Sequence, residues 1–338
     1  MVRNLLQSTQ RTVVNVDKLT YAANLASLKS VETNARYHFE HADICDARRI
    51  ADILAAYRPT AIVHLAAESH VDRSIDAPAD FIETNIVGTF ALLQEARRYW
   101  ESQDGSRRDA FRFIHVSTDE VFGSLGASGV FSEETAYAPN SPYSASKASS
   151  DHLVRAWHAT FGLPTIITNC GNNFGPCQFP EKLIPLAILQ GSAGRKIPVY
   201  GRGENIRDWI FVDDHAAALT RVLDKGVPGE TYNIGARNER RNIDVIRLIC
   251  GLLDEMTPNA TIGKHESLID FVPDRPGHDL RYAIDPGKIE RTLGWRASKT
   301  MEAALRTTVR WYLDNPQWCE RARREGEFAV RRGLGAAR

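Results

Sequence analysis

The segment FRFIHVSTD, Phe111–Asp119, is a short apolar run that ends in polar residues, which is the pattern of a buried strand in a parallel sheet. Similar runs lie on both sides of it, and helical patterns separate them at about 46–57, 79–100 and 143–161. Strands that alternate with helices of this length predict βαβ units, and therefore an α/β fold with a doubly wound parallel sheet. The other predicted strands are Thr12–Val16, Arg36–Ile44, Ala61–Ala67 and Thr165–Asn169.

The chain changes in character after about residue 170, where prolines and glycines become frequent. Short strands at Ile197–Gly201 and Arg207–Val212 and a helix at about 243–255 predict a smaller C-terminal α/β lobe that shapes a substrate cleft. We expect three parts: a first domain over 1–169, a second lobe over 170–322 with some segments returning to the sheet, and a poorly ordered tail over 323–338.

The composition excludes several classes of protein. The 338 residues carry 42 Lys+Arg and 42 Asp+Glu, so the formal net charge is zero and gives no general attraction to nucleic acid or an anionic membrane. The five cysteines are widely spaced without a C-x-x-C pair, which argues against disulfides and a structural zinc site. No apolar run reaches the ~20 residues of a membrane helix, and the N-terminal segment has no signal-peptide core. We expect a cytoplasmic protein with no bound metal.

Polar residues follow four of the predicted strands, at Asp17–Thr20, Asp43–Ile44, Ala66–Ser69 and Ser117–Glu120. Ligands of open α/β sheets bind beyond the carboxyl ends of the strands, so these residues are expected to meet at one site. An acidic residue after the second strand, here Asp43, is the type that hydrogen-bonds a ribose hydroxyl in Rossmann-type folds. A single Asp after a strand is often only a turn residue, but four polar strand ends together favour a ligand site.

Tyr143 and Lys147 are the strongest catalytic signal. They are four residues apart in a predicted helix and therefore lie on the same face. An ammonium there is expected to lower the pKa of the Tyr143 phenol from about 10 toward neutrality, so that the phenolate can take a proton from a sugar hydroxyl as hydride leaves the same carbon. Such a pair is often only a solvated helix face, but its place about 25 residues after the Ser117–Glu120 strand end favours catalysis.

Several motifs resemble the extended short-chain dehydrogenase/reductase family, and most of all its dTDP-glucose 4,6-dehydratases. The resemblance runs from about residue 11 to about 313, and Asp119-Glu120 is the pair that nucleotide-sugar epimerases usually lack. The motifs are STDEV (Ser117–Val121), SPYSASKASSDH (Ser141–His152), HLAAESHVDRS (His64–Ser74), DKLTYA (Asp17–Ala22), FPEKLIP (Phe179–Pro185), IRDW (Ile206–Trp209) and DRPGHDLRYAID (Asp274–Asp285).

The resemblance implies a hydro-lyase of deoxysugar biosynthesis, such as that of dTDP-rhamnose. Tyr143, with NAD, would oxidise C4 of the glucosyl ring, and Thr118 would hydrogen-bond near O4. Glu120 would remove the acidified C5 proton while Asp119 protonates the departing C6 hydroxyl, which requires the two carboxyl groups to differ in pKa. Hydride would then return to C6, so that the reaction yields dTDP-4-keto-6-deoxy-glucose and water, and NAD stays bound.

The resemblance also assigns binding residues, with NAD on the first domain, the nucleotide sugar mainly on the second lobe, and no nucleic acid or membrane partner. A homodimer would form through the helices near 79–100 and 143–161, and Arg207 would grip phosphate as a bidentate donor. For NAD the residues are Asp17, Lys18, Leu19, Thr20, Asp43, Ile44, Leu65, Ala66, Ala67, Glu68, Ser69, Thr84, Tyr143, Lys147 and Asn173. For the substrate they are Ser69, Thr118, Asn172, Lys182, Leu183, Pro198, Val199, Tyr200, Arg207, Asn242, Asp274, Arg275, Pro276, Gly277 and His278.

The chain departs from the family in two ways. Phe122 and Phe174 replace tyrosines, for which we expect small effects. The glycine-rich G-x-x-G-x-x-G turn that cradles a pyrophosphate is absent, and Met1–Leu6 resembles the last turns of the helix that follows it. We therefore expect a central strand to be lacking, through a misplaced start or a fragment. The alternatives are an epimerase, a dehydratase for another nucleotide, and a non-catalytic nucleotide-sugar-binding remnant.

Overall fold

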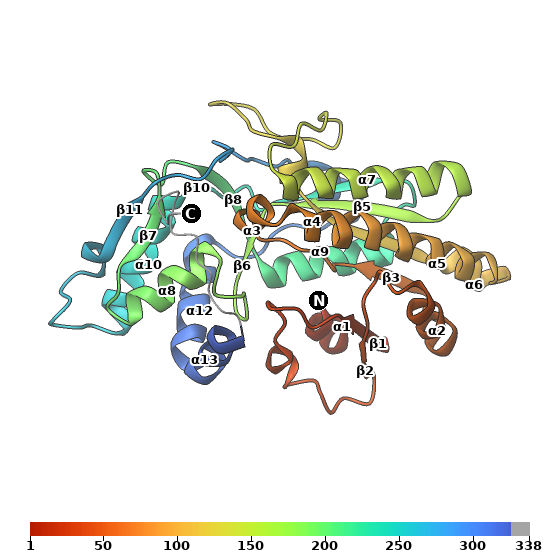
Figure 1. The fold of residues 1–338 in the computed structure, drawn as a ribbon, viewed down its shortest axis with the longest axis horizontal. Helices are drawn as coiled ribbons and strands as arrows, with labels where there is room; N and C mark the ends of the chain where they lie inside the picture. Colours follow the sequence, from red (N-terminus) through yellow and green to blue (C-terminus); the bar gives the residue numbers. More distant parts are fainter. Residues whose placement is uncertain (326–338) are drawn as a thin grey trace.

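The computed structural model describes residues 1–325, and a four-stranded parallel sheet with the order β3-β4-β5-β9 lies at its centre (Figure 1). All three strand pairings in this sheet are parallel, as the alternation of strands and helices predicts. The strands are β3 (Ala61–His64), β4 (Arg112–Thr118), β5 (Thr165–Cys170) and β9 (Thr231–Ile234).

Successive residues of β4 and β5 point to opposite faces of this sheet, and helices cover both faces. Phe113 and Ile167 pack against α2 (Ala47–Tyr57), α5 (Thr89–Glu101) and α7 (Pro142–Phe161). Their neighbours in sequence, Ile114 and Ile166, pack on the other side, against α9 (Val212–Lys225) and α11 (Gly287–Leu293). The long helices α5 and α7 run side by side (Figure 1). The fold is thus a doubly wound α/β sheet.

The sheet is interrupted between β3 and the first two strands. β1 (Val13–Asp17) and β2 (Tyr37–His41) pair in parallel as a separate sheet, and no pairing within residues 1–325 joins β1 to β3. Val16 and Ile62 are partly exposed, whereas Phe113 on β4 is fully buried. This break falls where the sequence predicts that a central strand is lacking. The N-terminal helix α1 (Val2–Ser8) packs Leu5 and Leu6 against β1.

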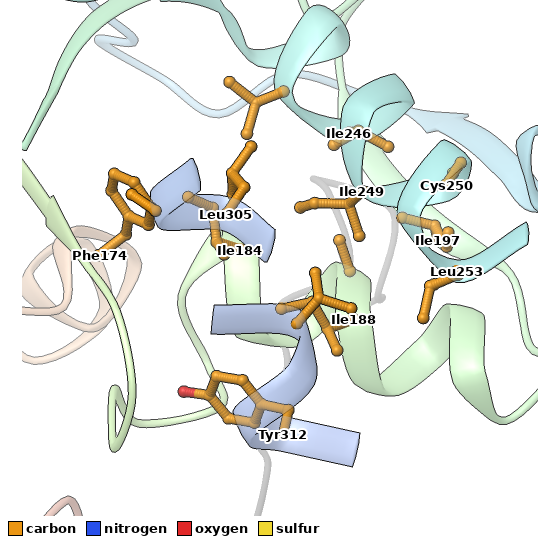
Figure 2. Packing of buried hydrophobic residues seen from close by; sticks show 14 of the residues in the cluster. Phe174, Ile184, Ile188, Ile197, Ile246, Ile249, Cys250, Leu253, Leu305 and Tyr312 are labelled. Carbon is orange, nitrogen blue, oxygen red and sulfur yellow. The ribbon is translucent and has the colours of Figure 1, made fainter. Parts of the chain in front are cut away.

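A second group of elements surrounds its own apolar core (Figure 2). Ile249 and Leu253 of α10 face Ile188 of α8 and Leu305 of α12, and all four side chains are fully buried. The helices are α8 (Leu183–Ser192), α10 (Asn242–Met256), α12 (Met301–Asp314) and α13 (Pro316–Glu325). The strands are β6 (Asn172–Phe174), β8 (Ile206–Phe211) and β10 (Glu239–Arg241) in one sheet, and β7 (Ile197–Tyr200) and β11 (Ile269–Val272) in another.

The single helix predicted at 79–100 is wrong in detail, because the segment is α4 (Pro78–Phe81), a π-helix η2 (Ile82–Gly88) and α5. π-helical turns are frequent at functional sites, and this one carries a buried asparagine described below. The remaining short helices are η1 (Leu25–Leu28), α3 (Val71–Asp76), α6 (Gly105–Ala110), η3 (Asp119–Phe122) and η4 (His265–Leu268).

The predicted tail over 323–338 begins inside α13, which ends at Glu325, and its other residues lie outside the described part of the chain. Phe122 and Phe174, the two family departures, both lie in buried hydrophobic clusters, where a ring without a hydroxyl needs no polar partner. None of the helices in residues 1–325 combines the length and the apolar character that a membrane crossing requires.

Candidate active site

The end of β4 and the start of α7 bring the predicted catalytic residues together. Thr118 caps η3 by accepting a hydrogen bond at Oγ1 from the Glu120 amide, at 3.3 Å, which fixes Asp119 and Glu120 in the turn after the strand. A capping box between Ser141 and Ser144, with Pro142 after the cap, starts α7. Tyr143 therefore lies in the first turn of α7, and its ring packs edge to face against that of Phe81, with the ring centroids 6.2 Å apart.

The two neighbouring carboxyl groups have different environments. Asp119 is 1% exposed, and its burial together with the charges of Glu120 and Asp208 raises its pKa well above the usual range. Burial also raises the pKa of Glu120, but the positive charges of Arg275, Arg207 and Lys182 oppose that rise. The pKa of Asp119 is therefore raised well above its usual range, whereas the rise for Glu120 is opposed by three cations, which makes Asp119 the better candidate for the acid and Glu120 for the base of an elimination.

The expected lowering of the Tyr143 pKa is wrong for the chain without bound ligands. Burial and the charge of Glu120 instead raise the pKa of Tyr143 well above 10. The Lys147 ammonium donates to the main-chain oxygen of Val116 at 2.9 Å, and its own pKa is lowered by burial. The sequence places Tyr143 and Lys147 on one helix face, but it does not reveal the carboxylates and the desolvation that surround the phenol.

A buried polar cluster lies behind Lys147 and was missed in the sequence. Asp151 is 0% exposed, and its Oδ2 accepts hydrogen bonds from Ser117 Oγ at 2.9 Å, from Tyr137 Oη at 2.8 Å and from Asn169 Nδ2 at 3.3 Å. The available signal was its position, four residues after Lys147 on the same helix face.

Asn85, in the π-helix η2, is the second residue that sequence reasoning missed. Its side chain accepts from the Glu68 amide at 2.9 Å and donates to the Glu68 carbonyl at 3.0 Å and to Ser146 Oγ at 2.8 Å. The loop after β3 is thereby tied to α7, next to the predicted cofactor residue Thr84. Nothing in the sequence distinguished Asn85 from an ordinary helix residue.

The loops after β1 and β2 also meet, as the polar strand ends predict. Lys18 Nζ lies 2.6 Å from Asp43 Oδ2. Burial acts to raise the pKa of Asp43, but the hydrogen bonds from Lys18 and the Cys45 amide lower it below its usual value. Asp17 accepts from the Leu19 amide at 2.8 Å. Ile44, after β2, is buried. The other predicted cofactor residues after β1 and β3 are partly or fully exposed: Thr20, Leu65, Ala66, Ala67, Glu68 and Ser69.

These residues fit part of a dinucleotide. The carboxylates of Asp17 and Asp43 can accept hydrogen bonds from ribose hydroxyls, and Tyr143 and Lys147 lie at the neighbouring strand end. Asn173 is held by its Oδ1, 2.8 Å from His215 Nδ1. The sequence contains no glycine-rich turn to supply amides to a pyrophosphate.

Residues after 180 close the site from the other side. Lys182 Nζ donates to the Ser69 carbonyl at 2.7 Å. Asp72, a buried residue of α3 that the sequence did not single out, accepts from Tyr200 Oη at 2.7 Å and from Arg275 Nη1 at 3.2 Å. These contacts connect the loop after β3 and α3 to β7 and the 274–278 loop.

Arg207 is only 4% exposed, with its guanidinium 4.1 Å from the Tyr282 ring centroid and Nη2 donating to the Asp279 carbonyl at 2.9 Å. The buried Oδ1 atoms of Asn172 and Asn242 have no hydrogen-bond partner within the described residues, so both can accept from a ligand.

Other predicted substrate residues differ in their accessibility. The Val199 side chain is 1% exposed in the second core, so only its main chain can reach a ligand. His278 Nδ1 lies 2.6 Å from Asp274 Oδ1 across the loop that contains Pro276 and Gly277. Leu183 and Pro198 are partly exposed at the starts of α8 and β7.

Comparison with known proteins gives consistent matches over nearly the whole chain. A family model described as GDP-mannose 4,6 dehydratase matches residues 1–308. The chain is 59% identical to a dTDP-glucose 4,6-dehydratase of Escherichia coli, over 98% of this chain and 94% of that protein. It is 59% identical to the dTDP-glucose 4,6-dehydratase of Neisseria meningitidis, over 94% and 90%. The crystal structure of the Streptomyces venezuelae dTDP-glucose 4,6-dehydratase with NAD and TYD bound matches with a TM-score of 0.86 and 44% identity, over 95% of each chain.

Proposed function

The chain belongs to the dTDP-glucose 4,6-dehydratase family, and we propose that Tyr143, Glu120 and Asp119 carry the proton transfers of that reaction. The enzyme is an NAD-dependent hydro-lyase that converts dTDP-glucose into dTDP-4-keto-6-deoxy-glucose and water. The observation that carries the assignment of roles is the pair at the end of β4, where Asp119 is buried with a raised pKa beside a Glu120 that faces three cationic side chains.

Tyr143 acts first, by taking the proton of the sugar C4 hydroxyl. Bound NAD supplies the hydride acceptor for this step and the hydride donor for the last one. The phenol must ionise in a site where burial and Glu120 raise its pKa. Lys147, one helical turn later on the same face, is the cation that stabilises the phenolate. Thr118 orients the substrate near O4.

The elimination follows, because a C4 ketone acidifies the C5 proton. Glu120 removes that proton, and the positive charges of Arg275, Arg207 and Lys182 favour its ionised form against the effect of burial. Asp119 gives its proton to the departing C6 hydroxyl, and the burial that raises its pKa keeps that proton available at neutral pH. Hydride return to C6 completes a reaction without net oxidation.

The two sides of the site divide the binding. Residues 1–169 hold NAD through the strand-end loops, with Asp17 and Asp43 on ribose. Residues 170–322 mainly hold the nucleotide sugar through the side chains predicted from sequence. The partnerless buried Oδ1 atoms of Asn172 and Asn242 support this division.

The function is tested by incubating the protein with NAD and dTDP-glucose and following the products by mass spectrometry and NADH absorbance. We expect a product that has lost one water, without net NADH. The matched Glu120→Gln protein should form no product. Lasting NADH accumulation in the unaltered protein, or a C4 epimer as sole product, would contradict the proposal.

Replacing Arg207 with lysine should raise KM for dTDP-glucose by about 10-fold, with a smaller change in kcat. Lysine cannot reproduce the planar fork that both stacks on Tyr282 and donates to the Asp279 carbonyl. Steady-state kinetics measures both constants. The control is Arg202→Lys, since the Arg202 side chain is 84% exposed in the same part of the chain. An unchanged KM would place Arg207 away from the nucleotide.

The homodimer predicted through 79–100 and 143–161 is also part of this proposal. Ile82, Val87 and Phe90 expose 47%, 40% and 43% of their surface on η2 and α5. The Phe90 ring meets the partly exposed Trp157 ring of the neighbouring α7, with the centroids 5.8 Å apart, so the apolar surface reaches from α5 to α7. A continuous apolar patch of this kind is typical of protein interfaces.

Phe90→Glu should convert a dimer into a monomer in light scattering, because it places a charge in that apolar patch. Phe271→Glu is the control, since Phe271 is 56% exposed on β11, in the other part of the molecule. If Phe90→Glu leaves the mass unchanged and Phe271→Glu lowers it, the interface lies elsewhere.

A cytoplasmic location is supported by the five free cysteines, whose thiols persist in a reducing compartment.

A further inference from the structure

Asp151 is a buried carboxylate on the face of α7 that carries the catalytic pair. Tyr143, Lys147 and Asp151 follow one another at intervals of four residues, so they form one row along the helix. Asp151 and Lys147 are 0% and 4% exposed. A charged group without solvent is costly unless other charges or hydrogen bonds stabilise it, so Asp151 has a role to be explained.

The nearest potential cation does not neutralise Asp151. His115 Nε2, on β4, lies 3.2 Å from Asp151 Oδ1. Burial and the charge of Lys147 lower the pKa of His115 to about 4, so the imidazole is neutral at physiological pH. Burial acts to raise the pKa of Asp151 as well, but the contact with His115, the charge of Lys147 and the hydrogen bond from Tyr137 bring it below its usual value. Asp151 is therefore ionised, and Lys147 is a cation that its charge can stabilise.

The same carboxylate fixes the end of the catalytic strand. Asp151 Oδ2 accepts from Ser117 Oγ at 2.9 Å and from Asn169 Nδ2 at 3.3 Å. Asn169 Nδ2 also donates to the Thr118 carbonyl at 3.1 Å. The residues directly before Asp119 are thus tied to α7 and β5 through one buried anion.

We propose that Asp151 is a positioning residue of the dehydratase reaction, whose charge keeps Lys147 protonated beside Tyr143 and whose hydrogen bonds hold the β4 end that carries Asp119. The proposal rests on the function given above. It concerns a residue that neither contacts substrate nor exchanges a proton with it.

Among the charged groups that act on Lys147, Asp151 has the largest effect on the pKa of its ammonium. Burial lowers the pKa of the buried His64 well below its usual value, and burial raises that of the Cys170 thiol to about 12, so both are neutral near pH 7. Among the carboxyl groups at the strand end, burial raises the pKa of Asp119 well above its usual range and so favours its neutral form. The titratable groups that interact electrostatically with Lys147 are His64 on β3, His115 on β4, Cys170 on β5 and Asp151 on α7.

The test is Asp151→Asn, which removes the charge and keeps the shape of the side chain. Burial already lowers the pKa of Lys147, and the Asp151 carboxylate raises it, so loss of the carboxylate must lower it further. The test measures how the single-turnover rate of NADH formation depends on pH. The alkaline limb of this pH–rate profile, where the rate declines as pH rises, should shift to a pH lower by about one unit or more. A purely structural loss would lower the rate at every pH and leave this limb in place.

Tyr137→Phe is the matched control, because it deletes the hydrogen bond from Tyr137 Oη to Asp151 Oδ2 but keeps the negative charge of Asp151. Its alkaline limb should stay where it is in the unaltered enzyme. An Asp151→Asn protein that folds, binds NAD and keeps its alkaline limb would overturn the proposal. If that variant does not fold, carboxyl-carbon NMR of the unaltered enzyme decides: an Asp151 that is protonated at pH 7 overturns the proposal, and an ionised one supports it.

Failure of the proposed function would look different from failure of this inference. In that case the unaltered enzyme would form no NADH from dTDP-glucose at any pH. Failure of the inference alone leaves that signal and its pH limb intact in both proteins.

Discussion

Replacing Tyr143 with phenylalanine lowers the rate of NADH formation from dTDP-glucose by about 10²–10⁴-fold, the usual contribution of a positioned acid–base group. Without the phenol, no ionisable group remains at this position to take the proton of the C4 hydroxyl. The ring of Tyr143 packs on Phe81 and is kept by phenylalanine, so the fold should not suffer. Single-turnover absorbance at the NADH band measures the effect.

Tyr57→Phe serves as the control for loss of a tyrosine hydroxyl. Tyr57 lies at the end of α2 and donates to Glu40 at 2.6 Å, away from the end of β4. Its rate of NADH formation should equal that of the unaltered enzyme. If Tyr143→Phe forms NADH at the same rate as Tyr57→Phe, another group takes the C4 proton.

Replacing Asp119 with asparagine leaves C4 oxidation in place and slows the loss of water by about 10²–10⁴-fold. Asparagine is neutral, like the protonated Asp119 that burial favours, so it fits the same 1% exposed position. It has no acidic proton to give to the C6 oxygen. In a single turnover, NADH should therefore appear at a normal rate and then persist instead of decaying.

Glu120→Gln separates the two carboxyl groups. It removes the base, so the C5 hydrogen should no longer exchange with deuterated solvent, whereas Asp119→Asn should still allow this exchange. NMR of the recovered sugar measures it. Equal loss of C5 exchange in both variants, or a normal decay of NADH in Asp119→Asn, would mean that the acid and the base have been assigned wrongly.

The sequence predicted the features of this fold and site that depend on neighbours along the chain. Apolar runs located β4 and β5, because both strands are buried on both faces. The spacing of Tyr143 and Lys147 placed them on one face of α7. The motif around Asp119 and Glu120 distinguished a dehydratase from an epimerase, and the comparisons with known proteins confirmed that family.

The features that depend on distant contacts could not be predicted. The π-helix η2 exists where Asn85 reaches the main chain of Glu68, 17 residues away. The helical periodicity of the sequence does not predict that contact. The pKa of Tyr143 was predicted in the wrong direction because helix spacing reveals Lys147, but not the burial or the approach of Glu120 from another element. Asp151 was missed because its partners come from three other segments.

The break between β1 and β3 has a consequence for how the molecule opens. No ladder of main-chain hydrogen bonds joins β1 to the central sheet within residues 1–325. The N-terminal segment is held to α9 by side-chain contacts such as Arg11 with Asp224 at 2.7 Å and Thr220 with Asn4 at 2.8 Å. Cooperative units of a protein can open separately when few contacts join them. Amide hydrogens of β1 and β2 should therefore exchange with deuterated water sooner than those of β4 and β5. The edge proposed to bind ribose can thus open while β4, at whose end the proposed catalytic carboxyl groups lie, stays folded together with β5.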